Sequence, residues 1–186
     1  MLFPMSPKPT AFLLAVASAV LFSTAAYAVP ETQFQSAYAQ FSQAQAGDSA
    51  AVDKAAETFA TLLATELGNP VLMAYAGAAL SMRARTTILP WKKMGYAEDG
   101  VAQIDKALSL LTPAHNAVLQ NGTPGVLETR FVAANTFLAV PGFMNRGARG
   151  AKLLDEVLTN PLFEKAPEGF QNAVRQRAAQ LKAKAP

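Results

Sequence analysis

The 186-residue chain contains no cysteine and only one histidine. Without cysteine, the protein cannot form disulfides, thiolate-based zinc or iron–sulfur sites, or a cysteine nucleophile. The single imidazole, His115, follows Pro113 in a stretch expected to be a loop, and metal sites and acid–base dyads usually need more than one such group. We therefore interpret His115 as a solvated loop residue and expect a domain that depends on its hydrophobic core.

Common catalytic motifs are also missing. The sequence has no G-x-G-x-x-G, Walker loop, H-E-x-x-H or G-x-S-x-G, which are typical of nucleotide-binding proteins, metalloproteases and serine hydrolases. The acid pairs Glu98-Asp99 and Asp155-Glu156 are adjacent, so their side chains point about 100° apart on a helix and do not form a ready dyad. We expect no enzyme activity, no cofactor and no metal. A site assembled from residues distant in sequence is the alternative left open.

Charge of one sign is not in large excess. The 16 basic and 13 acidic side chains leave a formal net charge of +3, whereas nucleic-acid-binding domains usually carry a strongly basic face. We therefore expect no nucleic-acid partner.

Residues 1–28 have the parts of a secretory signal. Lys8 is the only charged residue among them, a mostly apolar run follows at Ala11–Phe22, and Ala26-Tyr27-Ala28 has the small-x-small form of a cleavage site. The run is shorter than the roughly 20 residues of a membrane-spanning helix. We predict a cleavable signal peptide at 1–28 and a single periplasmic or secreted domain at 29–186. An uncleaved membrane anchor is the alternative.

The rest of the chain is predicted to be all-α, because its apolar residues recur at helical spacing. Turn and cap residues, such as Gly47-Asp48-Ser49 and Gly68-Asn69-Pro70, separate the periodic segments. The predicted helices cover about 31–46, 49–67, 70–85, 97–111, 125–140, 147–158 and 167–184. The small residues Ala74, Gly77 and Ala78 on the third helix suggest close contact with a neighbouring helix.

Two segments of the chain resemble each other at an offset of about 50 residues. GVAQIDKALS from Gly100 aligns with GAKLLDEVLT from Gly150, and LPWKKMGYAEDG from Leu89 aligns with VPGFMNRGARG from Val140 with one gap. Each preceding segment places Pro, an aromatic residue and Met before the second helix of a pair. Such internal similarity is typical of repeat architectures.

The pattern Gly100-x3-Ile104-x2-Ala107, followed by Pro113, resembles the second helix of a tetratricopeptide repeat (TPR); Ala76-Gly77 with Leu80 partly resembles the first. The resemblance implies an antiparallel helix-pair solenoid with pairs at 31–67, 70–112 and 125–160 and a C-terminal capping helix at 167–184. The 23 residues from Gly77 to Gly100 exceed the family's spacing of about 12. We therefore predict a connection within each pair that is longer by about ten residues.

These connections combine cations with aromatic residues and Met, types enriched at interaction surfaces. The candidate partner-binding residues are Arg83, Arg85, Trp91, Lys92, Lys93, Met94, Phe143, Met144, Arg146 and Arg149. In a regular array, equivalent connections lie along one edge, so these residues are predicted to form one basic–aromatic surface suited to an acidic, partly apolar peptide or an anionic lipid surface. Alternatively, each connection folds back and plugs the end of its own helix pair.

The sequence as a whole favours an exported TPR-like scaffold. Its expected partner is a protein or peptide of the cell envelope, held in a concave groove or against the connections. The alternative function is a small-ligand or lipid-binding accessory protein of envelope transport, in which Ala-rich helix faces line an apolar cavity.

Overall fold

The computed structural model describes residues 29–183 of the protein. These residues form seven α-helices: α1 (Glu31–Gln45), α2 (Ser49–Thr65), α3 (Pro70–Thr86), α4 (Pro90–Ser109), α5 (Gly125–Phe137), α6 (Gly147–Leu158) and α7 (Glu168–Ala183). Four short 3₁₀ helices lie in the connections: η1 (Pro113–Asn116), η2 (Gln120–Gly122), η3 (Gly142–Met144) and η4 (Phe163–Lys165). The all-α prediction is confirmed for this part of the chain. The predicted signal peptide lies outside it.

Two of the predicted breaks act as helix caps. The side chain of Asp48 accepts hydrogen bonds from the backbone N–H groups of the first turn of α2, and Asn69 does the same for α3. Pro70 occupies the first turn of α3, where its missing N–H costs no intrahelical bond. The polar residues between the periodic segments therefore satisfy backbone groups that would otherwise lack partners.

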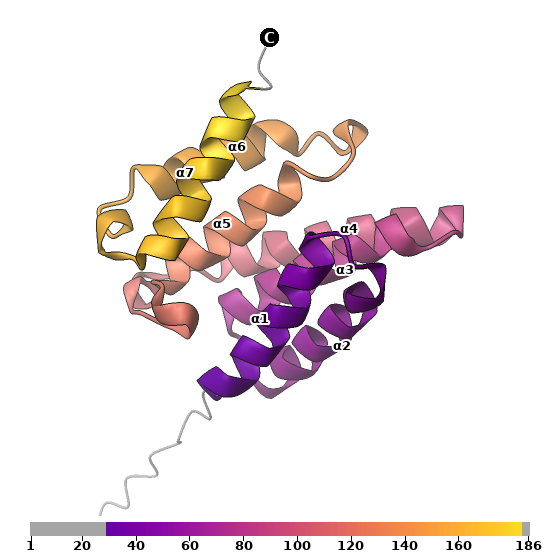
Figure 1. Ribbon diagram of the computed structural model, residues 1–186, viewed down its shortest axis with the longest axis horizontal. Helices are drawn as coiled ribbons and strands as arrows, with labels where there is room; N and C mark the ends of the chain where they lie inside the picture. Colours follow the sequence, from indigo (N-terminus) through magenta and orange to yellow (C-terminus); the bar gives the residue numbers. More distant parts are fainter. Residues whose placement is uncertain (1–28, 184–186) are drawn as a thin grey trace, which may run out of the picture.

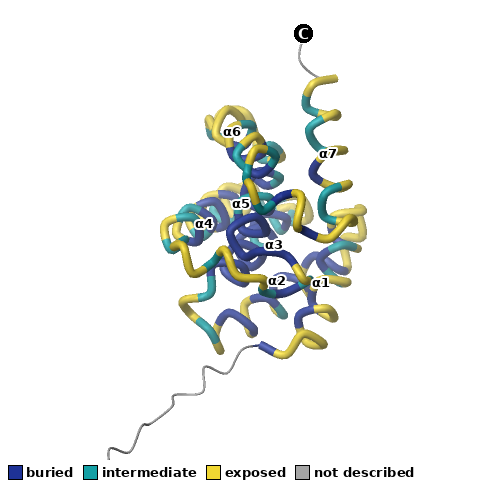
Figure 2. Tube along the Cα trace, turned by 90° about the vertical axis from the view of Figure 1, so that its left-hand side faces the viewer, coloured by how far each residue is buried: buried dark blue, intermediate teal, exposed yellow. Residues whose placement is uncertain are grey.

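Helix α3 lies at the centre of the molecule. Every residue from Pro70 to Met82 except Leu80 is buried, and Figure 2 shows this helix as an almost continuous dark-blue tube surrounded by the others. It contacts α1, α2, α4 and α5. A helix that is apolar on all sides is expected in a protein interior, and the residues of α3 form the middle of the hydrophobic core.

The helices are stacked in chain order. Each helix contacts the next one along the chain, and α3 also contacts α1 and α5. Figure 1 shows α1 and α2 on one side of α3 and α6 and α7 on the other. Between residues 29 and 183, no helix is long and apolar enough to cross a membrane.

The backbones of α3 and α4 touch where Gly77 meets Gly100. A Cβ atom added to Gly77 would lie 2.7 Å from the carbonyl oxygen of Gly100, closer than real Cβ contacts. Only glycine permits this approach, because any side chain would force the two helices apart. The close contact expected from the small face of this helix is confirmed.

The connection between α3 and α4 is much shorter than predicted. The structure leaves only residues 87–89 outside the two helices, and α4 begins at Pro90 instead of near Ala97. Proline is favoured in the first turn of a helix, so Pro90 starts α4 and does not interrupt a loop. The prediction of a connection lengthened by about ten residues is wrong for this pair, because the additional residues extend the helices.

Helix α5 ends earlier than predicted, at Phe137 instead of near Val140. The residue before a proline is disfavoured in helical conformation, and Pro141 follows closely. The segment from Leu138 to Arg146 is then a true connection that contains η3. The two internally similar segments therefore differ in structure: one is the first turn of α4, and the other is a loop.

Helix α7 covers the end of the stack with one face. Val174 is its only fully buried residue, and Phe170 and Leu181 are partly buried against the core. The remainder of the helix carries mostly polar side chains. The helix thus has one apolar face against the core and one polar face.

Candidate functional site

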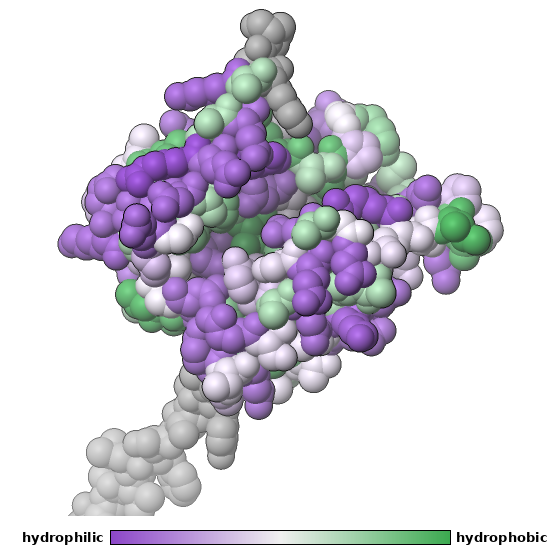
Figure 3. Space-filling view, viewed as in Figure 1, coloured by the Kyte–Doolittle hydropathy of each residue, from purple (hydrophilic) through white to green (hydrophobic). Residues whose placement is uncertain are grey.

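The end of the α3–α4 hairpin projects from the body of the molecule (Figure 1). Three large apolar side chains on this projection are exposed: Ile88 at 87%, Trp91 at 70% and Met94 at 40% of their full area. In the space-filling view, a dark-green apolar group stands out at this end among mostly pale neighbours (Figure 3). We define the α3–α4 tip as Arg85, Ile88, Trp91, Lys92, Lys93 and Met94.

Trp91 does not plug the end of its helix pair. It lies in the first turn of α4, and that turn extends past the part of the helix that packs on α3, where burial begins at Ala97. The interpretation of this segment as a folded-back structural plug is therefore wrong. Large apolar residues are usually buried, so three exposed ones on a projecting turn need a reason other than stability.

The cations of the tip carry no ion pair within the described residues. Arg85, Lys92 and Lys93 are exposed, and none of the salt bridges formed between residues 29 and 183 includes them. The tip therefore presents apolar surface beside positive charges that form no ion pair within the described residues.

Arg83 belongs to the helix surface below the tip. Its Nε lies 2.7 Å from Asp53, and one terminal nitrogen lies 3.2 Å from Glu57 on α2. Its guanidinium group also lies over the ring of Tyr96. Arg83 thus joins α2, α3 and α4, and its charge is largely compensated within the protein.

Arg146, at the end of the α5–α6 connection, and Arg149, in the first turn of α6, are also paired. Arg146 lies 2.9 Å from a carboxylate oxygen of Asp105 on α4, and Arg149 binds the other oxygen of the same group. Both guanidinium groups lie over the ring of Phe137, at 5.5 and 5.2 Å from its centre. They hold α4, α5 and α6 together, and little of their charge is available to a partner.

Phe143 and Met144, which both lie in the α5–α6 connection, differ in exposure. Phe143 is 65% exposed, so the plug interpretation is wrong for it, whereas Met144 is partly buried against the core. Asp105, which anchors this connection, lies 14 residues beyond Trp91, or about 21 Å along α4 at the usual helical rise. The ten candidate residues thus fall into three groups: those of the unpaired tip, the paired Arg83 below it, and those of the α5–α6 connection and the start of α6, whose arginines are paired.

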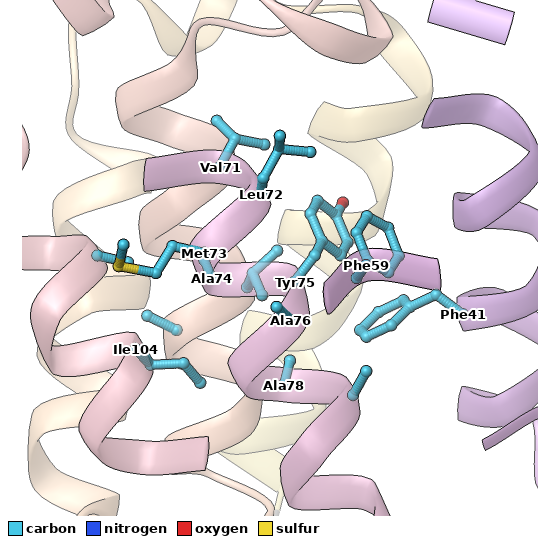
Figure 4. Packing of buried hydrophobic residues seen from close by; sticks show 14 of the residues in the cluster. Phe41, Phe59, Val71, Leu72, Met73, Ala74, Tyr75, Ala76, Ala78 and Ile104 are labelled. Carbon is cyan, nitrogen blue, oxygen red and sulfur yellow. The ribbon is translucent and has the colours of Figure 1, made fainter. Parts of the chain in front are cut away.

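A cleft that the sequence did not predict lies between α1, α3, α5 and α7. Its volume is about 270 Å³, and its lining includes Tyr38, Tyr75, Glu128, Phe131 and Phe170. Glu128 is 4% exposed, and its carboxylate accepts a hydrogen bond from the hydroxyl of Tyr75. Figure 4 shows Tyr75 on α3 with its ring beside Phe59 and Phe41.

Burial raises the pKa values of both Glu128 and Tyr75. Loss of hydration raises the pKa of the Glu128 carboxyl above its ordinary value, and hydrogen bonds from Tyr75, Asn121 and Thr123 lower it by less. The pKa of Tyr75 is well above its ordinary value, first because of burial and then because of the nearby Glu128 charge. The cleft therefore holds a carboxyl group in an environment that disfavours its charge.

The sequence contained only a weak signal for this cleft. Glu128 precedes Phe131 and Val132 by three and four residues, which puts a carboxylate on the inward face of a helix. The helical spacing of apolar residues does not separate the core from the cleft lining. Phe34, Phe59 and Met73 are buried in the core, whereas Tyr38 and Phe131 are less buried and line the cleft.

Comparisons with known proteins give no relative: no family model, no curated protein and no solved structure matches this chain. In the part of the chain that the structure describes, no cluster of three or more His, Asp or Glu residues could hold a metal ion.

Proposed function

We propose that this protein is an exported, TPR-like interaction module that binds a partner protein of the cell envelope through its α3–α4 tip. The observation that carries the proposal is the exposure of Ile88, Trp91 and Met94 beside three cations that lack ion pairs within the described residues. Exposed apolar groups of this kind are typical of interaction sites on soluble domains.

The composition of the tip defines the partner's complementary surface. Tryptophan is enriched among the residues that dominate binding energy, because its large ring is desolvated in a pocket of the partner. Lys92, Lys93 and Arg85 belong to the same tip and attract a partner of opposite charge. The partner therefore offers an apolar recess with acidic residues at its rim, and the complex weakens as salt is added.

The order of helix contacts supports the TPR-like arrangement. Consecutive helices pack on one another, and α3 packs on both α1 and α5, as first helices of successive repeats do in a solenoid. The odd-numbered helices also line a common cleft. The envelope location rests on the signal-like residues 1–28 of the sequence.

Capture of partners from an envelope extract of the source organism tests the proposal. Tagged wild-type protein is compared with Trp91→Ala and with the double variant Lys92→Glu/Lys93→Glu. We expect both variants to lose one specific partner, by at least tenfold for Trp91→Ala, since removal of a central anchor costs about 2 kcal/mol or more.

Leu67→Ala is the matched control, because Leu67 is 72% exposed just beyond α2 and lies outside the tip. It should retain every partner. Full retention by the two tip variants would contradict the proposal. So would binding of the wild type to anionic lipid vesicles that the tip variants lose while no protein partner is captured, because the tip would then be a membrane contact.

A further inference from the structure

The cleft between α1, α3, α5 and α7 contains one acidic side chain and no basic one. Glu128 is the only acidic residue among its lining residues, which include no Lys, Arg or His of the described chain. Five aromatic residues share the lining with it: Tyr38, Phe41, Tyr75, Phe131 and Phe170. We propose that the cleft binds an alkylammonium group, with the Glu128 carboxylate as its counter-ion and the aromatic rings around it. This site is separate from the α3–α4 tip and does not depend on the function proposed for it.

The charge of the cleft selects the class of ligand. An anion would meet the Glu128 carboxylate with no cation to offset the repulsion, so phosphates and carboxylic acids are disfavoured. A metal ion would find one carboxylate, whereas Ca²⁺ takes six to eight oxygen ligands. An organic cation requires a single counter-charge and tolerates an apolar surrounding.

The aromatic lining fits the same class. Cations are attracted to the negative faces of aromatic rings, and cages of such rings recognise quaternary ammonium groups and methylated lysine. The ring of Tyr75 is nearly perpendicular to those of Tyr38 and Phe41, with interplanar angles of 89° and 86°. Phe131 and Phe170 are also packed edge to face, at 75°. All five of these rings line the same cleft as Glu128.

The volume of the cleft and its opening to solvent suit a small alkylammonium group. Its volume of about 270 Å³ is close to the lower end of small-molecule pockets, which begin at about 300 Å³. Tyr38 is 37% exposed, and Phe131 and Phe170 are only partly buried, so the cleft is open to solvent on that side. Glu128, at 4% exposure, forms its deep end.

A bound cation would also supply the counter-charge that the protein does not place beside Glu128. A buried carboxylate without a counter-charge is costly, even when hydrogen bonds reach it. The groups that donate to Glu128 are neutral: Tyr75 on α3, and Asn121 and Thr123 on the η2 segment. Tyr38 on α1 is the other titratable group at the cleft. Binding an ammonium group therefore stabilises the ionised form of Glu128.

Calorimetry with choline and its uncharged isostere, 3,3-dimethylbutan-1-ol, tests the proposal on the full mature chain. The two probes have nearly the same shape and differ in charge. We expect choline to bind at least tenfold more tightly than the alcohol at neutral pH. Equal affinity, or no measurable binding of either probe, would overturn the proposal.

Two variants and a control assign the binding to the cleft. Glu128→Gln keeps the size of the side chain and removes its charge, so it should abolish the preference for choline. Tyr38→Ala should weaken choline binding at least threefold and keep the preference, because the carboxylate remains. Asp155→Asn, which changes an exposed carboxylate on α6, should bind choline like the wild type. An unchanged preference in a folded Glu128→Gln variant would sink the proposal even if choline binds.

A blocked lysine, N-acetyl-lysine methylamide, distinguishes two sources of the alkylammonium group. Tighter binding of choline would indicate a small metabolite, and tighter binding of the blocked lysine would indicate a side chain of a bound peptide. For either source, affinity should rise as pH increases through the native pKa of Glu128, because the carboxylate must be ionised. Affinity that does not rise as the pH is increased from 4.5, the ordinary pKa of a glutamate side chain, would contradict the role of Glu128.

Discussion

The α3–α4 and α5–α6 hairpins have similar sequences at their turns and different structures. Each turn contains Pro, an aromatic residue and Met. In the first hairpin, Pro90 opens a helix of 20 residues and leaves a connection of three residues, 87–89. In the second, Pro141 follows the end of a helix of 13 residues, and a longer connection precedes the 12-residue α6.

The difference changes what the two turns present to solvent. The longer helices carry the α3–α4 tip beyond the core, where its cations have no ion pairs within the described residues. The α5–α6 connection remains against α4, where Arg146 and Arg149 share Asp105. Residue types alone therefore do not identify a binding surface. The turn that extends beyond the core has cations without ion pairs, whereas the turn that lies against α4 has cations paired with Asp105.

The largest effect is expected where the two helices of each hairpin touch. A methyl group added at the α3–α4 contact should destabilise the protein more than one added at the α5–α6 contact. A Cβ on Gly100 would lie 2.5 Å from the carbonyl oxygen of Gly77 and 2.8 Å from the backbone nitrogen of Ser81. We expect Gly100→Ala to lower the free energy of unfolding by about 3 kcal/mol, as overpacking of a tight contact does.

Gly150→Ala is the counterpart in the second hairpin. Its Cβ would lie 2.9 Å from Cγ of Leu138, a side chain that can move, and 3.1 Å from the carbonyl oxygen of Ala134. The gain in helix propensity offsets part of the cost, so we expect a loss of about 1 kcal/mol or less. Urea denaturation of both variants measures the difference; equal losses would show that the α3–α4 contact is no tighter.

Removal of Asp105 should release the guanidinium groups of Arg146 and Arg149. The groups are partly exposed, so we expect Asp105→Ala to cost about 1 kcal/mol in low salt and less in high salt. Denaturation at two salt concentrations measures this effect, with Asp155→Ala as the control because no ion pair of the described residues includes Asp155. A loss that does not change with salt would mean that packing, and not charge, explains the role of Asp105.

The smallest effect is expected at the tip. Trp91 is 70% exposed, so Trp91→Ala should change the free energy of unfolding by less than about 0.5 kcal/mol. Since Trp91 is the only tryptophan, the fluorescence of the wild-type protein should be that of a solvated indole and should be quenched readily by iodide. Blue-shifted emission that resists quenching would place the ring in the core and contradict the contrast between the hairpins.

The helices could be predicted from sequence because their signals are local. Apolar spacing, the caps Asp48 and Asn69, and the glycine contact at Gly77 are each read within one segment, and each is present in the structure. The start of α4 was predicted seven residues too late because Pro90 was interpreted as a loop residue. Proline is compatible with both a loop and a first helical turn, so the local pattern did not choose between them.

The candidate sites depended on contacts between distant residues. Trp91, Lys92 and Lys93 were identified by type, yet their exposure follows from the length of α3 and α4 beyond the core. Tyr75 and Glu128 are 53 residues apart, and nothing in either segment indicates that they form a buried pair. Nor could local charge show that Arg83, Arg146 and Arg149 bind acids on other helices.

The sequence by itself determined the helical class of this protein, the breaks between most helices and the small residues that allow α3 and α4 to touch. These features are set by backbone preference and by the period of apolar side chains, which act over a few residues. Only the tertiary structure decided which cations remain unpaired, that Trp91 faces solvent, and that Glu128 lies among aromatic rings. Those outcomes depend on which helices meet, because burial and pairing of charge are properties of the packed molecule and not of any one segment.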